Sequence, residues 1–382
     1  MRAAAAGIIV VVAVLGVLFR DFLADDAFIT LAFARSLVET GAPSLGGHNV
    51  NALSSPLWFG VSTLLVAGFG PDLAPLALKF ASAAGTVAAG VLTFALARRL
   101  TDDARLQGLA VVLLLADAWM GRWSWSGMEA SWAAAAVVLG LLLREQGKGL
   151  EGAILLVVVG VQLRPELGLF GVLLGVEACW RMSSAPPTDG RLRRIRQAAA
   201  PMAVGVVLVI GWGFAALHWF GQVEPQSAAI KAGVLSPPAA AVQALKVIAV
   251  GQGVALALLL VRGAETMRRA WVALAWLGLL TAFYVVQGYE PLSRYLLLGL
   301  VGVPAYAAAG VDRRWALPAM AGAVILGGAV TMTVTVPTSS GDMVRFYRDV
   351  GDEVEPGSRL ATWEIGALGY YEIGRASCRE RV

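Results

Sequence analysis

The chain has 382 residues, of which 58% are hydrophobic and 15% are charged, and its mean hydropathy is +0.72. Soluble domains carry about 25% charged residues, so this composition excludes a soluble globular enzyme and indicates an all-α polytopic membrane protein. The formal net charge of +4 comes without the patterned basic face of a nucleic-acid-binding protein, and two cysteines exclude a disulfide framework or a CxxC metal site.

The first apolar run, Ala3–Phe19, has no small-residue cleavage site before Asp21, so we interpret it as an uncleaved first span. A basic residue precedes the run and acidic residues follow it, which predicts a cytoplasmic N-terminus. Asp25 and Asp26 then lie at the outer mouth of this span, where ionisable groups usually mark a functional site. The alternative is helix capping, but capping needs only one of the two carboxylates.

The next stretch is predicted to form interfacial structure outside the membrane. Ala27–Val38 has apolar residues every three or four positions, which indicates an amphipathic helix at the outer boundary. Gly41–Ser55 is rich in loop residues. Pro56–Gly70 is short against the ~20 residues that a span needs. Crossing there would also put Arg98-Arg99, at the end of Leu73–Ala97, outside the cytoplasm, so we predict an interfacial or re-entrant helix.

The positive-inside rule orders the remaining runs into a bundle of about eleven crossings. The clearest cytoplasmic loop is Arg181–Arg196, which is rich in arginine. Two of the runs are short and separated by Arg164-Pro165-Glu166, so they either cross as broken helices or form a re-entrant pair. The predicted crossings are Ala3–Phe19, Leu73–Ala97, Leu106–Trp119, Ala130–Leu143, Gly152–Leu163, Leu167–Trp180, Ala198–Phe220, Ala239–Val261, Trp271–Val286, Leu296–Gly310 and Trp315–Val336.

The composition changes after the last crossing. Residues 1–336 form the predicted membrane domain, and residues 337–372 are soluble in character, which indicates the start of an extracytoplasmic domain that is cut short. The final segment, Ile373–Val382, resembles the translation of a sequencing adapter, so we exclude it from the fold and expect the natural chain to continue differently. A genuine basic tail is the alternative.

This topology collects the charged residues that are costly near lipid on the outer face. Carboxylates suit a general base or a divalent cation, and arginine and lysine suit phosphate. Their convergence at the membrane boundary indicates a substrate that is itself a lipid phosphate. Arg164 with Glu166 could instead be a structural ion pair. The residues are Asp25, Asp26, Arg35, Glu129, Arg164, Glu166, Lys231, Glu290 and Arg294.

Several motifs, in order along most of the chain, resemble the GT-C glycosyltransferases, and within them the branch of the mycobacterial terminal arabinofuranosyltransferases. Two motifs depart from that branch: Ala32-Phe33-Ala34 stands where relatives have Arg-Tyr-Ala, and Gln226-Ser227 where they have Asn-Thr. The matching motifs are Asp25-Asp26-Ala27-Phe28-Ile29-Thr30, Ser55-Pro56-Leu57-Trp58, Ser126-Gly127-Met128-Glu129, Arg164-Pro165-Glu166, Pro225-Gln226-Ser227 with Lys231, Arg294-Tyr295, and Ile365-Gly366-Ala367-Leu368-Gly369-Tyr370-Tyr371.

The resemblance implies a GT-C-like helical bundle in the bacterial cytoplasmic membrane with its active site outside. Its donor is then a polyprenyl-phosphate sugar and its acceptor a glycan, lipid or protein of the cell envelope. Transfer inverts the anomeric carbon, with Asp25 or Asp26 as general base. The residues implied to bind substrate are Arg35, Glu129, Arg164, Glu166, Lys231, Arg294 and Tyr295.

Some members of that family use a divalent metal, which Asp25, Asp26 and Glu129 could hold. One alternative function is a transporter or flippase of a lipid-linked or small anionic substrate, which predicts internal repeats that the sequence does not show. Another is a membrane assembly factor without catalytic activity, which would leave the outer carboxylates without a role.

Overall fold

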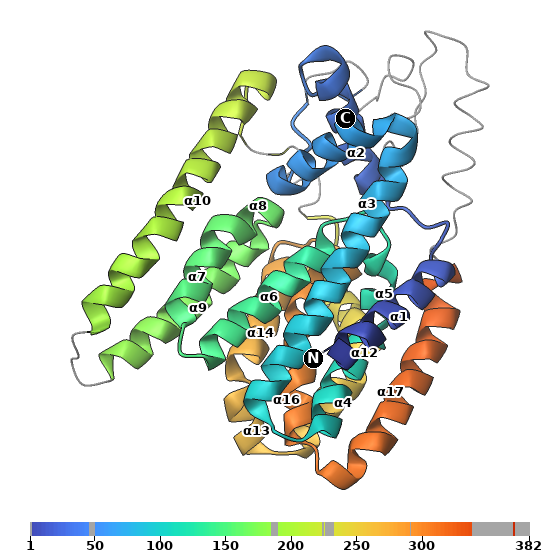
Figure 1. The fold of residues 1–382 in the computed structure, drawn as a ribbon, viewed down its shortest axis with the longest axis vertical. Helices are drawn as coiled ribbons and strands as arrows, with labels where there is room; N and C mark the ends of the chain where they lie inside the picture. The colour runs from blue at the N-terminus through green and yellow to red at the C-terminus, as the bar shows by residue number, and fades with distance from the viewer. Residues whose placement is uncertain are drawn as a thin grey trace.

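The computed structural model describes residues 2–45, 50–184, 190–223, 225, 233–290, 292–337 and 370, with 190–202 and 204 described by their backbone alone. Every regular element in this described part is a helix, which confirms the all-α class. Most helices lie side by side in a bundle, and α2 lies at one end of it (Figure 1). Residues 338–382 lie outside the described part except for Tyr370, so the division of the chain at residue 337 stays a prediction.

The predicted apolar runs fall on helices, and the helix bounds follow in chain order. They are α1 (Arg2–Leu18), α2 (Asp25–Thr40), α3 (Pro56–Leu100), α4 (Ala104–Leu115), α5 (Ala118–Ser124), α6 (Ala130–Glu145), α7 (Gly149–Leu155), the π-helix η1 (Leu156–Gly160), α8 (Val161–Leu163), α9 (Glu166–Ser183), α10 (Gly190–Phe220), α12 (Pro237–Val261), α13 (Ala264–Arg269), α14 (Trp271–Val286), α15 (Ser293–Leu300), α16 (Val303–Gly310), the 3-10 turn η2 (Arg313–Trp315), α17 (Ala316–Val330) and the π-helix η3 (Thr331–Thr335).

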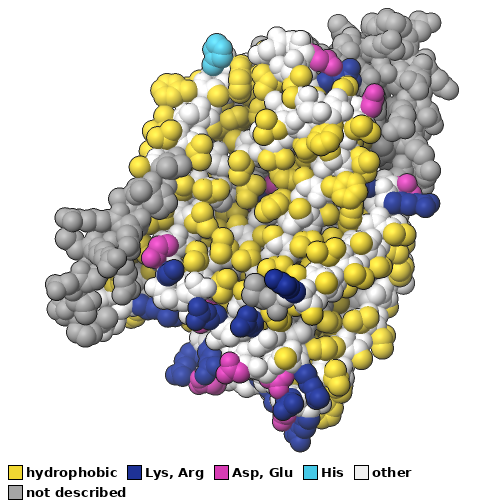
Figure 2. All heavy atoms as spheres, viewed as in Figure 1, with side chains coloured by type: hydrophobic (Ala, Val, Ile, Leu, Met, Phe, Trp, Pro, Cys, Tyr) yellow, Lys and Arg dark blue, Asp and Glu magenta, His cyan; other side chains and the backbone are white. Residues whose placement is uncertain are grey.

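The helices are long and apolar enough for a multi-pass membrane protein. Among the described residues, three helical stretches could cross by length and composition: α3, α12 and Arg313–Thr335. The bent pair of α4 and α5 is a fourth candidate. Hydrophobic side chains cover most of the face seen in Figure 2, and most of its Lys and Arg lie towards the end opposite α2. The number of eleven crossings and their orientation stay predictions.

Helix α2 confirms the helix predicted over Ala27–Val38 and extends it at both ends. It begins at Asp25 and ends at Thr40, and its C-cap is Gly41, whose φ of 79° is readily adopted only by glycine. Leu31 and Phe33 are two positions apart and so point to nearly opposite sides of the helix. Both are fully buried, so the rest of the protein covers α2 on more than one side.

Helix α3 is broken where the sequence predicts the end of a short helix. Gly70 has φ 76° and ψ 167°, which is not helical, and Pro71 and Pro75 follow it. These prolines lack the backbone N–H that an α-helix needs, so the regular hydrogen bonding is interrupted here. The segments before and after Gly70 are therefore distinct, as predicted, and whether the first lies in the interface stays a prediction.

Two other predicted runs are also interrupted. The run 106–119 bends by 66° between α4 and α5. Asp117 accounts for this bend, because its Oδ1 accepts hydrogen bonds from the backbone N–H groups of Trp119 (2.7 Å) and Met120 (3.0 Å) and so starts a new helix. The run 296–310 divides into α15 and α16, and Pro304 stands in the first turn of α16.

The two short runs over residues 149–183 are helical, and whether they cross or form a re-entrant pair stays a prediction. The two runs meet at Arg164, whose extended backbone (φ −153°, ψ 129°) is typical of a residue before proline. The predicted loop 181–196 is partly wrong, since α9 continues to Ser183 and α10 begins at Gly190. Leucine, arginine and alanine dominate the start of α10 and are strong helix formers, so the basic charge there does not prevent a helix.

Candidate active site

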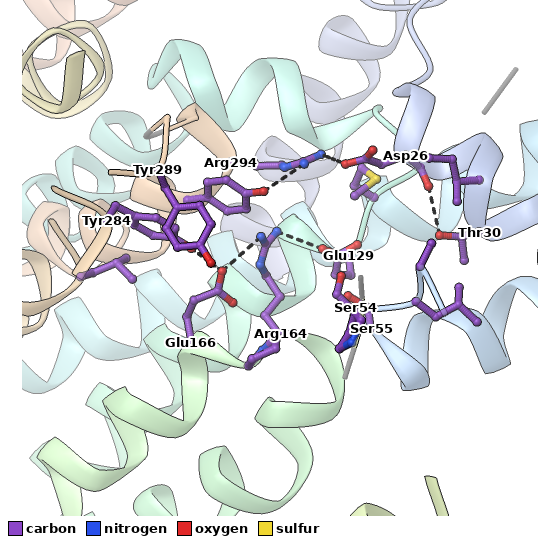
Figure 3. Close-up of a pocket in the computed structure, with 18 of the residues that line it drawn as sticks. Asp26, Thr30, Ser54, Ser55, Glu129, Arg164, Glu166, Tyr284, Tyr289 and Arg294 are labelled. Atoms are coloured by element: carbon purple, nitrogen blue, oxygen red, sulfur yellow. Dashed lines mark hydrogen bonds and ion pairs between the residues drawn. The ribbon is translucent and has the colours of Figure 1, made fainter. Parts of the chain in front are cut away.

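A pocket of about 620 Å³ lies where α2, α9, α14 and α15 meet the chain before α3 and α6. Its size is that of a small-molecule site. Polar and charged side chains from distant parts of the sequence point into it or lie along its wall (Figure 3). The lining residues are Asp26, Ile29, Thr30, Ala52, Leu53, Ser54, Ser55, Met128, Glu129, Arg164, Pro165, Glu166, Leu169, Pro225, Leu280, Phe283, Tyr284, Tyr289, Arg294 and Tyr295.

One half of the pocket is built around Arg164. Its Nη1 lies 2.9 Å from Oε1 of Glu129, and its Nη2 lies 3.5 Å from Oε1 of Glu166. The side chains of Arg164 and Glu129 are only 7% and 4% exposed, so these charges meet in a poorly solvated environment. Burial raises the pKa of the Glu129 carboxyl, and the guanidinium of Arg164 opposes that shift. The predicted pair of Arg164 with Glu166 is therefore present, with Glu129 as a second carboxylate.

The other half is an ion pair between Asp26 and Arg294, in which Nη1 of Arg294 contacts Oδ2 of Asp26. The two partners differ in burial: the Arg294 side chain is 8% exposed and that of Asp26 is 36% exposed. Arg294 also donates from Nη2 to the Tyr295 hydroxyl at 3.1 Å. Asp26 is therefore the accessible member of the pair, and Arg294 is held by its additional hydrogen bond to Tyr295.

Aromatic rings connect the two halves. Tyr284 donates its hydroxyl hydrogen to Glu166, and its ring stacks on Tyr295 with centroids 4.9 Å apart. The guanidinium carbons of Arg164 and Arg294 lie 4.9 and 5.0 Å from the Tyr295 ring centroid, a cation–π geometry. Tyr295 therefore joins both arginines to one aromatic wall.

Buried polar atoms without hydrogen-bond partners concentrate at this cluster. Within the described residues they include Nε of Arg164, Nε of Arg294 and Oε2 of Glu166. Such atoms are uncommon in native proteins, and several of them beside one pocket indicate a functional site rather than a purely structural network.

The structure brings most of the predicted residues together, but not all of them. Asp26, Glu129, Arg164, Glu166, Arg294 and Tyr295 line the pocket. Asp25 and Glu290 are not among the lining residues. Arg35 does not line the pocket either, because it bonds Glu39 at 2.7 Å and the carbonyl oxygen of Tyr370 at 2.9 Å. Lys231 lies outside the described residues.

Two lining residues, Tyr284 and Tyr289, were not predicted from the sequence. Tyr284 belongs to an apolar run, where a tyrosine is typical of a membrane interface and carries no sign of a site. Their position in the sequence could have indicated a role in the site, because both residues closely precede Arg294 at the same predicted outer end.

The structure also tests the simpler roles of the two aspartates. Ala24, not an aspartate, is the N-cap of α2, and no side-chain cap hydrogen bond is formed there. The described residues contain no group of three or more His, Cys, Asp or Glu side chains that could hold a metal ion. Glu129 is paired with Arg164 at 2.9 Å, and the metal set of Asp25, Asp26 and Glu129 stays a prediction.

The wall of the pocket carries three carboxylates and two guanidinium groups. Arg164 is neutralised by two carboxylates, whereas Arg294 forms one ion pair with a carboxylate among the described residues, that of Asp26. An anion that enters the pocket therefore competes with fewer carboxylates at Arg294 than at Arg164, and it displaces the more exposed one. Chemically, the site offers an exchangeable cation next to a carboxylate that can accept a proton.

The chain matches no family model and no curated protein. It does share its fold with solved structures. ArnT from Cupriavidus metallidurans bound to undecaprenyl phosphate aligns with a TM-score of 0.72 and 13% identity over 98% of this chain and 86% of that chain. The same protein in the apo state aligns with a TM-score of 0.68 and 14% identity over the same shares. The chain therefore has the GT-C fold that the motifs predicted, and membership of the GT-C superfamily or of the proposed branch stays a prediction.

Proposed function

We propose that this protein is a GT-C glycosyltransferase that moves a sugar from a polyprenyl-phosphate donor to an envelope glycan, lipid or protein. It acts on the outer face of the bacterial cytoplasmic membrane. The observation that carries the proposal is the ion pair between Asp26 and Arg294 at the wall of a pocket, within a GT-C fold. The similar protein ArnT was solved with undecaprenyl phosphate, which supports a lipid-phosphate donor.

In the proposed reaction, the acceptor hydroxyl gives its proton to the Asp26 carboxylate as its oxygen attacks the anomeric carbon. The bond from that carbon to the phosphate oxygen breaks, the configuration inverts, and polyprenyl phosphate leaves with the bonding electrons. We assign the base to Asp26 rather than Asp25 because Asp26 lines the pocket. Arg294, the buried partner, stabilises the negative charge that develops on the phosphate.

These two roles are linked by the ion pair. A carboxylate bonded to a guanidinium is a weakened base, because the cation stabilises its charged form. The phosphate of the donor carries negative charge to the same guanidinium and so competes with Asp26 for it. Donor binding then releases the carboxylate for the acceptor hydroxyl, and the site becomes basic only when the leaving group is in place.

The remaining lining residues have supporting roles in this scheme. Arg164 is neutralised by Glu129 and Glu166, so we assign it to holding these carboxylates in place for the sugar hydroxyls rather than to the phosphate. Lys231 is proposed as a further cation for the phosphate. The apolar wall near Ile29 and Leu280 suits the less polar faces of donor and acceptor.

The test is sugar transfer in proteoliposomes from a panel of labelled polyprenyl-phosphate sugars, with the arabinofuranose donor included because of the motif resemblance. Asp26→Asn should lower turnover by about 10²–10⁴-fold, the usual contribution of a general base, and still bind donor. Asp21→Asn is the matched control, because Asp21 is 54% exposed and pairs only with Arg20 among the described residues. Transport of a labelled lipid or anion without any transfer would refute the proposal in favour of a transporter.

A further inference from the structure

Tyr370 lies far from the bundle in sequence but is buried against it. Its side chain is 1% exposed, and its ring centroid lies 5.8 Å from that of Phe28 in α2. Arg35, two turns along the same helix, donates from Nη1 to the carbonyl oxygen of Tyr370 at 2.9 Å. The guanidinium carbon of Arg35 is also 6.0 Å from the tyrosine ring centroid. Helix α2 thus contacts Tyr370 through an aromatic ring, a cation and a backbone hydrogen bond.

The hydroxyl of Tyr370 contacts α3 where the regular hydrogen bonding of that helix is broken. It donates to the carbonyl oxygen of Pro71, directly after the break in α3 at Gly70. In a regular helix that carbonyl accepts from the N–H four residues later, but that residue is Pro75, which has no N–H. Tyr370 therefore supplies the hydrogen bond that the proline removes, and one side chain joins α2 to the break in α3.

The opposite side of α2 forms part of the pocket. Asp26, Ile29 and Thr30 line the pocket, whereas Phe28 and Arg35 contact Tyr370. At about 100° per residue, Arg35 lies roughly opposite Asp26 around the helix axis. A force that holds the Tyr370 side of α2 in place therefore also fixes the distance of Asp26 from Arg294 across the pocket.

We propose that Tyr370 is a positioning residue, and that its socket of Phe28, Arg35 and Pro71 is the surface through which Tyr370 holds α2 in the geometry needed for catalysis. This inference rests on the proposed function, since it concerns the placement of the proposed base. It also reassigns Arg35, which the sequence analysis placed at the substrate, to the docking of Tyr370.

The first arm of the test is hydrogen–deuterium exchange on the full chain in detergent micelles, which needs no substrate. Tyr370→Ala should speed amide exchange in α2 and around residues 70–75 at least several-fold, because the socket loses its contacts. Tyr306→Ala is the matched control, because Tyr306 is equally buried at 1% but bonds Glu145 in a different part of the bundle. Unchanged exchange in α2, or an equal increase in the control, would overturn the proposal.

The second arm measures transfer kinetics on the same variants. Tyr370→Ala should lower kcat by about 10–100-fold with little change in KM for the donor, since an error of about 1 Å in the position of a reacting group has effects of this size. Tyr370→Phe keeps the ring on Phe28 and Arg35 and loses the bond to Pro71, so it should recover most of kcat.

The two arms separate the possible failures. A wild-type protein that transfers no sugar while Tyr370→Ala still loosens α2 refutes the proposed function and leaves the anchor standing. An active protein in which Tyr370→Ala keeps its full kcat refutes the positioning role, whatever the exchange data show.

Discussion

Replacing Arg164 by methionine should destabilise the protein strongly. The change removes the cation that lies 2.9 Å from Glu129 and 3.5 Å from Glu166, and it leaves two buried carboxylates without the cation that they share. Breaking a buried ion pair by removing one partner costs about 3–5 kcal/mol, which is roughly a 150- to 5,000-fold rise in the unfolding constant. Unfolding in mixed micelles with increasing denaturant, followed by tryptophan fluorescence, measures this free energy.

The origin of the loss can be tested by charge. Adding Glu129→Gln and Glu166→Gln to the methionine variant removes the unpaired charges, so most of the stability should return. The deficit of the single variant should also shrink as the pH falls, because protonation of the stranded carboxylates favours the folded state, and grow as the pH rises. Arg268→Met is the control, since its partner Glu265 is exposed and we expect no measurable loss. If Arg164→Met and Arg268→Met unfold alike, the structural role of Arg164 is wrong.

Two further substitutions test the backbone around the site. Gly127→Ala should lower the free energy of unfolding by about 2 kcal/mol or more, because φ is +73° and a Cβ atom would lie 2.4 Å from Cδ1 of Leu23. Gly41→Ala is the control, because its φ is +79° and nothing lies within 4 Å of a Cβ atom there, so it measures the backbone strain alone. Equal losses of stability in the two variants would refute the clash with Leu23. Asp117→Ala should cost about 1 kcal/mol of unfolding free energy, since the N–H groups of Trp119 and Met120 lose their acceptor, and a midpoint equal to that of the wild type would contradict this.

Much of the site was predictable because charge is conspicuous in an apolar chain. Asp26, Glu129 and Arg294 stand out where the surrounding residues favour lipid, and such charges are retained near a membrane mainly where they act or pair. The helix α14 was predicted with the bounds that the structure shows, since its run is long, apolar and flanked by polar residues. Hydropathy therefore predicted helices such as α14, and charge predicted residues that line the pocket between the helices.

The pairing of these residues was not predictable from the same signals. Charge alone does not say that Arg164 takes two carboxylates and Arg294 takes Asp26, because pairing depends on how helices far apart in the sequence pack together. Arg35 could have been excluded from the pocket by the sequence alone. Nine positions along an α-helix place it on the side opposite Asp26, so the two side chains are not expected to line the same pocket.

The ion pair of Asp26 and Arg294 also constrains how the protein is made. Arg294 follows Asp26 by about 270 residues, which at roughly 5–20 residues per second takes the ribosome about 15–50 s. During that interval α2 and its carboxylate exist without the cation that neutralises them in the finished protein. The Asp26 carboxylate of the nascent α2 therefore needs hydration in that interval, and the pocket closes around it only when α15 emerges.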